Sequence, residues 1–351
     1  MKKILTLVLA LALVMGCFAA VAEGKLYISV ISKGEQHAFW QQVRKGCEDA
    51  AADYGVDMYY YGPPSESDIA LQIEALNSEL AKNPNAICLA ALDTESVMAQ
   101  CAEALSKNIP IVGFDSGVPG APEGSIVSTV ATDNAAAAGL AAEKFLEQDG
   151  FVDLLKSGTA DKPVVIGVLS QDANSMSVSY RTSGFAEKMA ELASEYNTVS
   201  VEGHDKWANP VDGAGVIVQI AVGATAEMND MVNAANSLLS MEGLAAVFCS
   251  NEGAANAFLA ATSSGADLAE GGAHGDLIVA GFDAGANQKN AVRQQWFIGA
   301  VSQNPYKIGY VSVENAVKAA NGEAVEDVDT GAVWYNYENI DAEDVAPLVY
   351  D

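Results

Sequence analysis

The chain has 351 residues, half of them hydrophobic, and its 46 acidic against 18 basic side chains give a formal net charge of −28. This length is enough for two domains with full cores, and the composition is not that of a disordered chain. The acidic excess argues against nucleic acid and against an anionic lipid surface as partners, because both are bound through Lys and Arg.

The first 22 residues have the pattern of an export signal. Two lysines are followed by an apolar run at 4–15 and by the small-x-small sequence at 20–22, so we expect export and cleavage after Ala22. The apolar run is too short to indicate a transmembrane helix. A second interpretation stays open, because the four residues that end at Cys17 resemble a lipobox. Lipidation of Cys17 would anchor the protein in the cell envelope, whereas cleavage would release it into the periplasm.

The first half of the mature chain alternates strands and helices. Apolar runs predict strands at 26–32, 58–61, 86–90 and 109–114, and helical periodicity predicts helices at 39–54, 68–80 and 94–105. Such alternation predicts a parallel sheet with right-handed crossovers. The pattern starts again at Val164.

The second half repeats motifs of the first. An apolar run ends in Gly-Phe-Asp-x-Gly twice, at 113–117 and at 281–285. The offset between equivalent positions grows from 138 (184 minus 46) to 168 (283 minus 115), as expected of a duplicated unit with insertions in its second copy. We therefore predict an α/β fold with two similar Rossmann-like lobes, each a parallel sheet flanked by helices.

Each Gly-Phe-Asp motif places a carboxylate, Asp115 or Asp283, where a buried strand stops. In open parallel sheets, ligands bind outside the carboxyl ends of the strands. An Asp at such a place can also cap the following helix, but recurrence of the whole motif favours a binding role.

No pattern for catalysis, metal binding or a cofactor is present. The sequence lacks a Gly-x-Ser-x-Gly elbow, a His-Glu-x-x-His motif, a phosphate-binding Gly loop and a calcium loop. The cysteines beyond the signal have neither disulfide-framework nor metal-ligand spacing, so we expect buried free thiols at Cys47, Cys88, Cys101 and Cys249.

Eight short motifs in register resemble the type I periplasmic sugar-binding proteins of ABC transporters, in the branch of the ribose-binding proteins. They extend from about residue 26 to residue 345 and comprise Phe39-Trp40 with Gly46, Gly-Phe-Asp at 113–115, Thr-Asp-Asn at 132–134, Arg181 with Gly184-Phe185, Asn251-Glu252, Gly-Phe-Asp at 281–283, Gln303, and Asp-Thr-Gly at 329–331.

The resemblance implies a periplasmic binding protein of type I, with two lobes joined by a three-segment hinge that closes on a ligand. The implied first lobe comprises 25–132 plus 304–330, and the second comprises 133–303 plus 331–351. The implied function is capture of a monosaccharide or related polyol between the lobes and delivery to the membrane permease of an ABC importer. We expect a monomer that is not an enzyme.

Two alternatives of function stay open within this fold. The protein could be a sensor subunit for a sugar-like signal, such as an autoinducer-type furanose, or a subunit that binds nucleosides. A transcriptional regulator of the lactose-repressor type would need an N-terminal DNA-binding headpiece, whereas this chain has an export signal there.

The resemblance also implies which residues contact the ligand. Phe39 and Trp40 match the aromatic pair that holds the sugar ring, and we expect Phe39 to be the more buried of the two. The other ligand positions are occupied by His37, Asp115, Ser116, Arg181, Asn251, Asp283 and Gln303.

Three departures from the ribose-type pattern put ribose itself in doubt. This chain has Asp115-Ser116 in place of Asp-Arg, and His37-x-Phe39-Trp40 in place of Asn-x-Phe-Phe. The aromatic residue expected from the second lobe is replaced by Ala226, for which Trp207 in an inserted loop is a candidate substitute.

Overall fold

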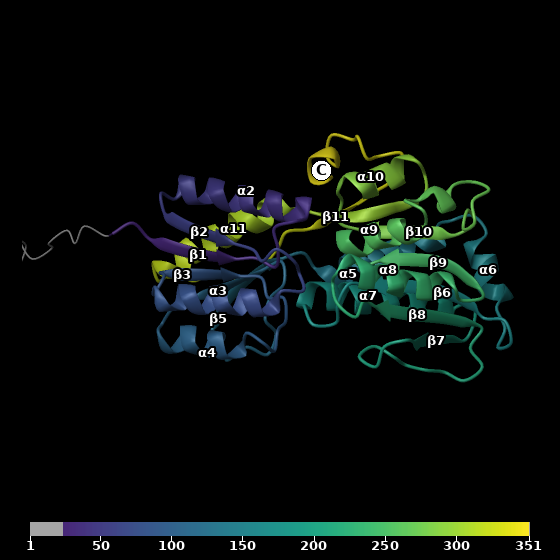
Figure 1. Ribbon diagram of the computed structural model, residues 1–351, viewed down its shortest axis with the longest axis horizontal. Coiled ribbons are helices and arrows are strands. Elements are labelled where there is room, and N and C mark those ends of the chain that lie inside the picture. The colour runs from purple at the N-terminus through teal and green to yellow at the C-terminus, as the bar shows by residue number, and fades with distance from the viewer. Residues whose placement is uncertain (1–23, 351) are drawn as a thin grey trace, which may run out of the picture.

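The computed structural model describes residues 24–350, so the predicted export signal, its cleavage site and Cys17 lie outside the described residues. Two lobes lie side by side, each with a sheet covered by helices (Figure 1). This confirms the predicted α/β class with two parallel-sheet lobes.

The first lobe is built on a six-stranded parallel sheet in the order β12-β5-β4-β3-β1-β2. Its strands are β1 (Tyr27–Ile31), β2 (Asp57–Tyr61), β3 (Ala86–Leu89), β4 (Ile111–Phe114), β5 (Ile126–Ala131) and β12 (Val328–Asp329). Its helices are α2 (Ala38–Asp53), α3 (Ile69–Ala81), α4 (Met98–Ser106) and α11 (Pro305–Ala320).

The second lobe has a seven-stranded sheet in the order β13-β11-β10-β9-β6-β8-β7, in which only β13 is antiparallel among the described strands. Its strands are β6 (Val164–Ser170), β7 (Val199–Glu202), β8 (Val216–Val222), β9 (Leu244–Cys249), β10 (Ile278–Phe282), β11 (Gly299–Gln303) and β13 (Ala332–Tyr335). Its helices are α5 (Asn134–Leu146), α6 (Phe151–Ser157), α7 (Met176–Ser194), α8 (Met228–Leu239), α9 (Glu252–Ala261) and α10 (Ala286–Arg293), and 3₁₀ turns occupy 266–268 and 346–348.

The strands of each sheet end at a common level. In the first lobe Ile31 pairs with Leu89, and Leu89 pairs with Gly113. In the second lobe Phe282 pairs with Val301. The residues that follow these strands are therefore gathered at one edge of each sheet, where a parallel sheet presents its binding loops.

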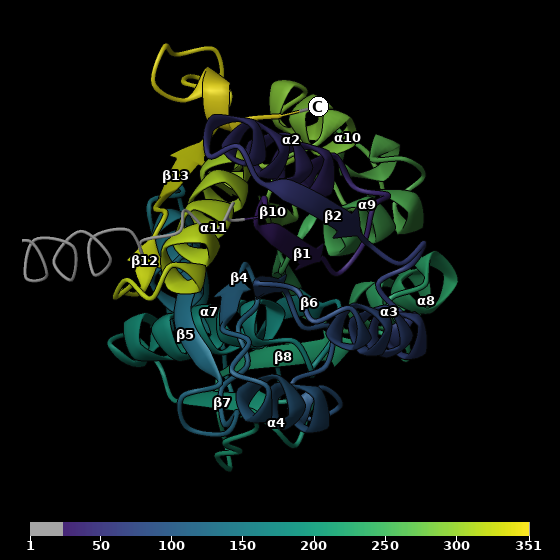
Figure 2. The same cartoon turned by 90° about the vertical axis from the view of Figure 1, so that its left-hand side faces the viewer.

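Late segments of the chain return to the first lobe. Helix α11 packs against α2 and β12 pairs with β5, although both follow strands β6–β11 of the second lobe in sequence (Figure 2). The passages between the lobes lie side by side, because Thr132 Oγ1 is 3.4 Å from Thr330 Oγ1 and donates to the carbonyl oxygen of Gly331 at 3.3 Å.

A glycine on one helix of each lobe, α2 in the first and α7 in the second, allows close helix packing. A side-chain carbon at Gly46 of α2 would overlap the backbone of Tyr306 in α11, and one at Gly309 of α11 would overlap α2 in turn. In the second lobe, a side-chain carbon at Gly184 of α7 would overlap Ala135 of α5. Gly46 and Gly184 are equivalent positions of the sequence repeat, so both copies use the same packing device.

The predicted helix at 94–105 begins only at Met98. The residues before it form a turn, in which Ser96 donates its backbone N–H to Asp93 Oδ1 at 2.8 Å. Thr94 donates its backbone N–H to Asn174 of the other lobe at 3.3 Å. Residues 94–97, which the periodicity assigns to the helix, therefore form a turn that contacts the other lobe.

The four described cysteines are free and buried, as predicted. Within residues 24–350, no helix has both the length and the apolar character needed to cross a membrane.

Candidate functional site

A polar cavity, which we call the central cavity, lies between the two lobes at the carboxyl ends of the strands. Its empty space, including crevices that open to solvent, amounts to about 300 Å³. Every predicted ligand residue except Ser116 lines it: His37, Phe39, Trp40, Asp115, Arg181, Asn251, Asp283 and Gln303. Four residues that were not predicted as ligand contacts also line it: Lys33, Glu66, Val178 and Glu252.

Asp283 is held by its own lobe. It follows β10 with φ of +73°, a left-handed conformation that Asp tolerates better than most residues. Its Oδ2 accepts hydrogen bonds from Arg181 Nη1 and from the backbone N–H of Glu252, both at 3.2 Å. Its Oδ1 accepts from Gln303 Nε2 at 2.6 Å. This carboxylate is fixed before any ligand arrives.

Asp115, the equivalent residue of the first lobe, is held less completely. It follows β4 with φ of +52°. Lys33 Nζ lies 3.3 Å from its Oδ2, and Arg181 Nη2 of the other lobe lies 3.9 Å from its Oδ1. Oδ2 is buried and has no hydrogen-bond partner. Burial raises the pKa of Asp115, and the charges of Lys33 and Arg181 offset this only in part.

Arg181 stands between the two carboxylates. It comes from α7, is only 3 % exposed, and donates from Nε to Asn134 Oδ1 at 2.7 Å. Its guanidinium carbon lies 4.0 Å from the ring centroid of Phe282, a cation–π arrangement. With Nη1 bonded to Asp283, the guanidinium is fixed in a single orientation and Nη2 is directed toward Asp115.

Lys33 and Glu66 add a second pair of charges. Burial disfavours the charge of Lys33, but Asp115, Glu66 and Asp172 outweigh it and raise the pKa of the ammonium group. Burial likewise opposes ionisation of Glu66, but Lys33, His37 and two hydrogen bonds lower the pKa of this carboxyl. Both side chains are therefore charged at neutral pH.

His37 and Glu252 face each other across the lobes. His37 precedes α2 of the first lobe, Glu252 begins α9 of the second, and Nδ1 lies 3.8 Å from Oε1. Burial disfavours the imidazolium, but the nearby carboxylates of Glu252, Glu66 and Asp283 raise the pKa of His37 to about 9. An ion pair therefore joins the lobes at neutral pH.

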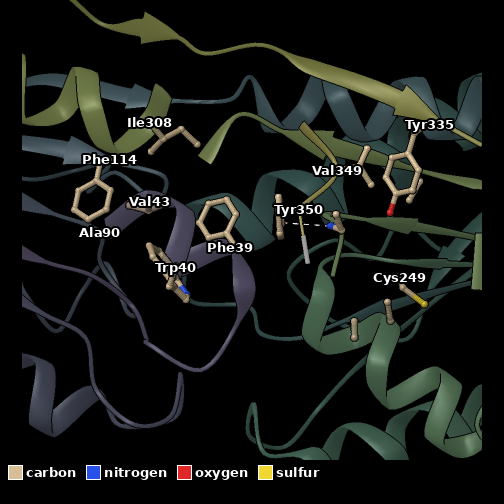
Figure 3. Close-up of a cluster of buried hydrophobic side chains, with 14 of the residues drawn as sticks. Phe39, Trp40, Val43, Ala90, Phe114, Cys249, Ile308, Tyr335, Val349 and Tyr350 are labelled. Atoms are coloured by element: carbon tan, nitrogen blue, oxygen red, sulfur yellow. Dashed lines mark hydrogen bonds between the residues drawn. The ribbon is translucent and has the colours of Figure 1, made fainter. Parts of the chain in front are cut away.

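The expectation that Phe39 is more buried than Trp40 is wrong, because Phe39 is 5 % exposed and Trp40 is 2 % exposed. Trp40 is covered because its Nε1 donates to Glu66 at 2.7 Å and its ring packs edge-on against Phe114. Phe39 lies between Trp40 and Tyr350, at 4.9 and 6.1 Å between ring centroids (Figure 3). The end of the chain thus covers the first-lobe aromatic pair.

The structure does not bring Ser116 into the central cavity. Its Oγ accepts backbone hydrogen bonds from Met176 at 3.0 Å and Ser177 at 3.3 Å. Ser116 therefore caps the beginning of α7 from the other lobe.

Trp207 does not line the central cavity either. Its ring packs against His204, with 4.9 Å between centroids, and beneath the ammonium of Lys206. Ala226 lines a separate cavity. No aromatic residue of the second lobe thus lines the central cavity.

Three buried side-chain oxygens that belong to residues lining the central cavity have no hydrogen-bond partner. These oxygens are Asp115 Oδ2, Glu252 Oε2 and Gln303 Oε1. Carboxylate and amide carbonyl oxygens are hydrogen-bond acceptors. A ligand that completes the cavity must therefore supply several hydrogen-bond donors. Within residues 24–350 no group of His, Cys, Asp and Glu is arranged to hold a metal ion.

Comparison with known proteins agrees with this geometry. The family model described as "Periplasmic binding protein domain" matches residues 28–324. A solved structure described as "ABC transporter, LacI family transcriptional regulator" from Brachyspira murdochii is 38 % identical, with a TM-score of 0.77, and the match covers 93 % of this chain and 99 % of that chain.

Two curated relatives are named for sugars. The D-allose-binding periplasmic protein of Escherichia coli (strain K12) is 23 % identical over 305 residues, 86 % of each chain. The ribose import binding protein RbsB of Salmonella typhimurium is 23 % identical over 326 residues, 93 % of this chain and 95 % of that protein. These relatives are binding proteins and not enzymes. The chain belongs to the periplasmic binding protein family, in the type I, ribose-binding-like branch that its sequence motifs predict.

Proposed function

We propose that this protein captures a monosaccharide or related polyol in the central cavity and delivers it to the permease of an ABC importer. The observation that carries the proposal is the set of buried acceptors, Asp115 Oδ2, Glu252 Oε2 and Gln303 Oε1, which face a cavity between two lobes. A polyhydroxylated molecule supplies the donors that these oxygens lack.

The fixed donors of the site suit the same ligand. Each sugar hydroxyl both donates and accepts, so it can bridge a carboxylate and a cation such as Arg181 or Lys33. Hydrogen bonds to charged groups contribute about 1.5–3 kcal/mol each. A few of them, with the Phe39–Trp40 pair against the ring, are sufficient for affinities on the order of micromolar or tighter. The relatives named for allose and ribose support this ligand class.

Closure of the lobes couples capture to delivery. The acceptor Asp115 belongs to the first lobe, whereas Arg181 and Asp283 belong to the second. A ligand that contacts both lobes stabilises the closed arrangement, because it has more partners there than in an open one. We assign 25–132 plus 304–330 to one moving unit and 133–303 plus 331–351 to the other.

The same proposal places the protein outside the cytoplasmic membrane, as a monomer in the periplasm or attached to the cell envelope. The export-signal pattern and relatives named as periplasmic support this location. Intact-mass analysis of protein from the native host distinguishes a chain that begins at Glu23 from one that begins at a lipidated Cys17.

A ligand screen tests the function. We expect at least one pentose, hexose, deoxysugar or polyol to raise the melting temperature of the mature protein progressively as its concentration increases, as a native-state ligand does. Small-angle scattering should show a smaller radius of gyration with this ligand, and the ligand should be recovered unchanged. Nucleosides and autoinducer-type furanoses belong in the same screen, because a response to these alone would replace the proposal. Turnover of the ligand would contradict it.

A further inference from the structure

A second cavity, which we call the outer cavity, lies between the lobes beside the central one. Counted in the same way, it encloses about 750 Å³. Glu66, Ser67 and Leu92 contribute its first-lobe wall, and Gln171 and the loop 222–226 contribute much of its second-lobe wall. Both lobes therefore contribute walls to the outer cavity, as they do to the central one.

A single row of hydrogen-bonded side chains separates the two cavities. Glu66 lines both of them. Its Oε1 accepts from Trp40 Nε1 at 2.7 Å, and its Oε2 accepts from Gln171 Nε2 at 2.8 Å across the lobes. Gln171 Oε1 in turn accepts from Asn251 Nδ2 at 2.8 Å. We call these four side chains the partition. It consists of groups that bind sugar hydroxyls elsewhere in proteins as readily as they bind one another.

The outer cavity has polar groups of its own to offer. Ser67 Oγ is buried there without a hydrogen-bond partner. Neither Lys nor Arg is among the lining residues, whereas the carboxylates of Glu66 and Asp172 are. A phosphate or carboxylate group would be repelled, so the chemistry favours an uncharged group with hydroxyls.

We infer that the central and outer cavities are two subsites of one elongated site, and that the ligand is a sugar extended by a second uncharged ring, as in a disaccharide or glycoside. This inference rests on the proposed function. The first ring occupies the central cavity, and the linkage passes between Glu66 and Gln171. Their mutual hydrogen bond is then exchanged for bonds to the ligand, and Ser67 Oγ bonds to the second ring.

Calorimetry on the mature protein with matched sugars tests the inference. The probes are D-glucose with cellobiose and maltose, D-galactose with melibiose and lactose, and D-xylose with xylobiose. We expect one disaccharide to bind at least tenfold more tightly than its own monosaccharide. A smaller preference in every pair that binds would overturn the inference and leave monosaccharide capture intact. Absence of binding by every probe would also overturn the inference, whereas the wider ligand screen described above decides the proposed function.

Two substitutions locate the second ring. Ala226→Leu fills part of the outer cavity without touching the central one, and Ala260→Leu is a control at an exposed position of α9. We expect Ala226→Leu to weaken binding of the disaccharide at least tenfold and to change the affinity for its monosaccharide by less than twofold. The melting temperature of Ala226→Leu should equal that of the control variant. Equal weakening of both sugars, or of neither, would overturn the assignment. Ser67→Ala should weaken the disaccharide alone to a smaller degree.

Discussion

The two Gly-Phe-Asp loops place the same carboxylate on the same left-handed backbone in two different environments. Asp283 has its partners Arg181, Gln303 and the backbone of Glu252 within the second lobe. Asp115 Oδ2 has no hydrogen-bond partner, and the carboxylate relies on ion pairs with Lys33 and with Arg181 of the opposite lobe. The second lobe is therefore ready to hold a ligand by itself, and the first lobe completes its contacts only on closure.

The difference predicts opposite effects on stability. The largest effect is expected for Asp283→Ala, which leaves Arg181 buried beside an empty position. Removing one partner of a buried ion pair costs about 3–5 kcal/mol of unfolding free energy, and sugar binding should be lost. Chemical denaturation measures this cost, with the exposed Asp276→Ala as control. A loss as small as that of the control would show that Asp283 does not organise the second lobe.

Asp115→Asn should weaken ligand binding about 10- to 100-fold, because a carboxylate hydrogen bond is lost, but should stabilise the ligand-free protein. The pKa of Asp115 is raised in the folded state, so its charge costs stability once the pH exceeds that pKa, and the cost disappears as the pH falls below the unfolded value. Melting curves at several pH values should show a higher melting temperature for the variant than for the wild type at pH 7. The difference between the two melting temperatures should shrink as the pH is lowered. A variant less stable than wild type at pH 7 would contradict the comparison.

Gly46 and Gly184 allow the helix packing of the two lobes to be compared. Gly46→Ala and Gly184→Ala each force a side chain against the backbone of a neighbouring helix. Overpacking of this kind costs about 1–3 kcal/mol. We expect similar costs in both lobes by denaturation, since the device is the same. Gly24→Ala, which meets no neighbouring atom, is the control. If only one of the two variants lost stability, Gly46 and Gly184 would be equivalent in sequence but not in their packing role.

The smallest effect concerns the ion pair between the lobes. With its pKa raised to about 9, His37 favours the closed state fully below about pH 6.5, the ordinary value, and ceases to do so as the pH rises through about 9. Ligand affinity should fall about three- to tenfold between pH 7 and pH 10. His37→Gln should remove this dependence, and His274→Gln should retain it. Calorimetry across this range gives the comparison, and a flat wild-type profile would rule out the ion pair as a closing contact.

The sequence predicted the fold because alternating apolar runs and repeated motifs are local signals. The second copy was predicted to start at Val164, and β6 begins there. The start of α4 was missed because Thr94 contacts the other lobe, and such a contact leaves no trace in periodicity.

The candidate site was only partly predictable, for a similar reason. Asp115 and Asp283 follow strands and carry a recognisable motif. Glu66 lies in a loop after β2, and what brings it to the cavity is its hydrogen bonding to Trp40 and Gln171, which are distant in sequence. Lys33 could have been found, since a charged residue just beyond the end of β1 satisfies the rule that was applied to the two Asp residues.

The return of α11 and β12 to the first lobe has a consequence for biosynthesis. The helix pair α2–α11 is joined only when residues about 260 positions apart meet, as Cys47 Sγ does with the carbonyl oxygen of Gly309. No nascent chain that ends before Asp329 can complete the first lobe, because the edge strand β12 of its sheet has then not been made. Contacts of such long range also slow folding. The order of the segments along the chain thus delays completion of the first lobe until after the strands β6–β11 of the second lobe have been synthesised.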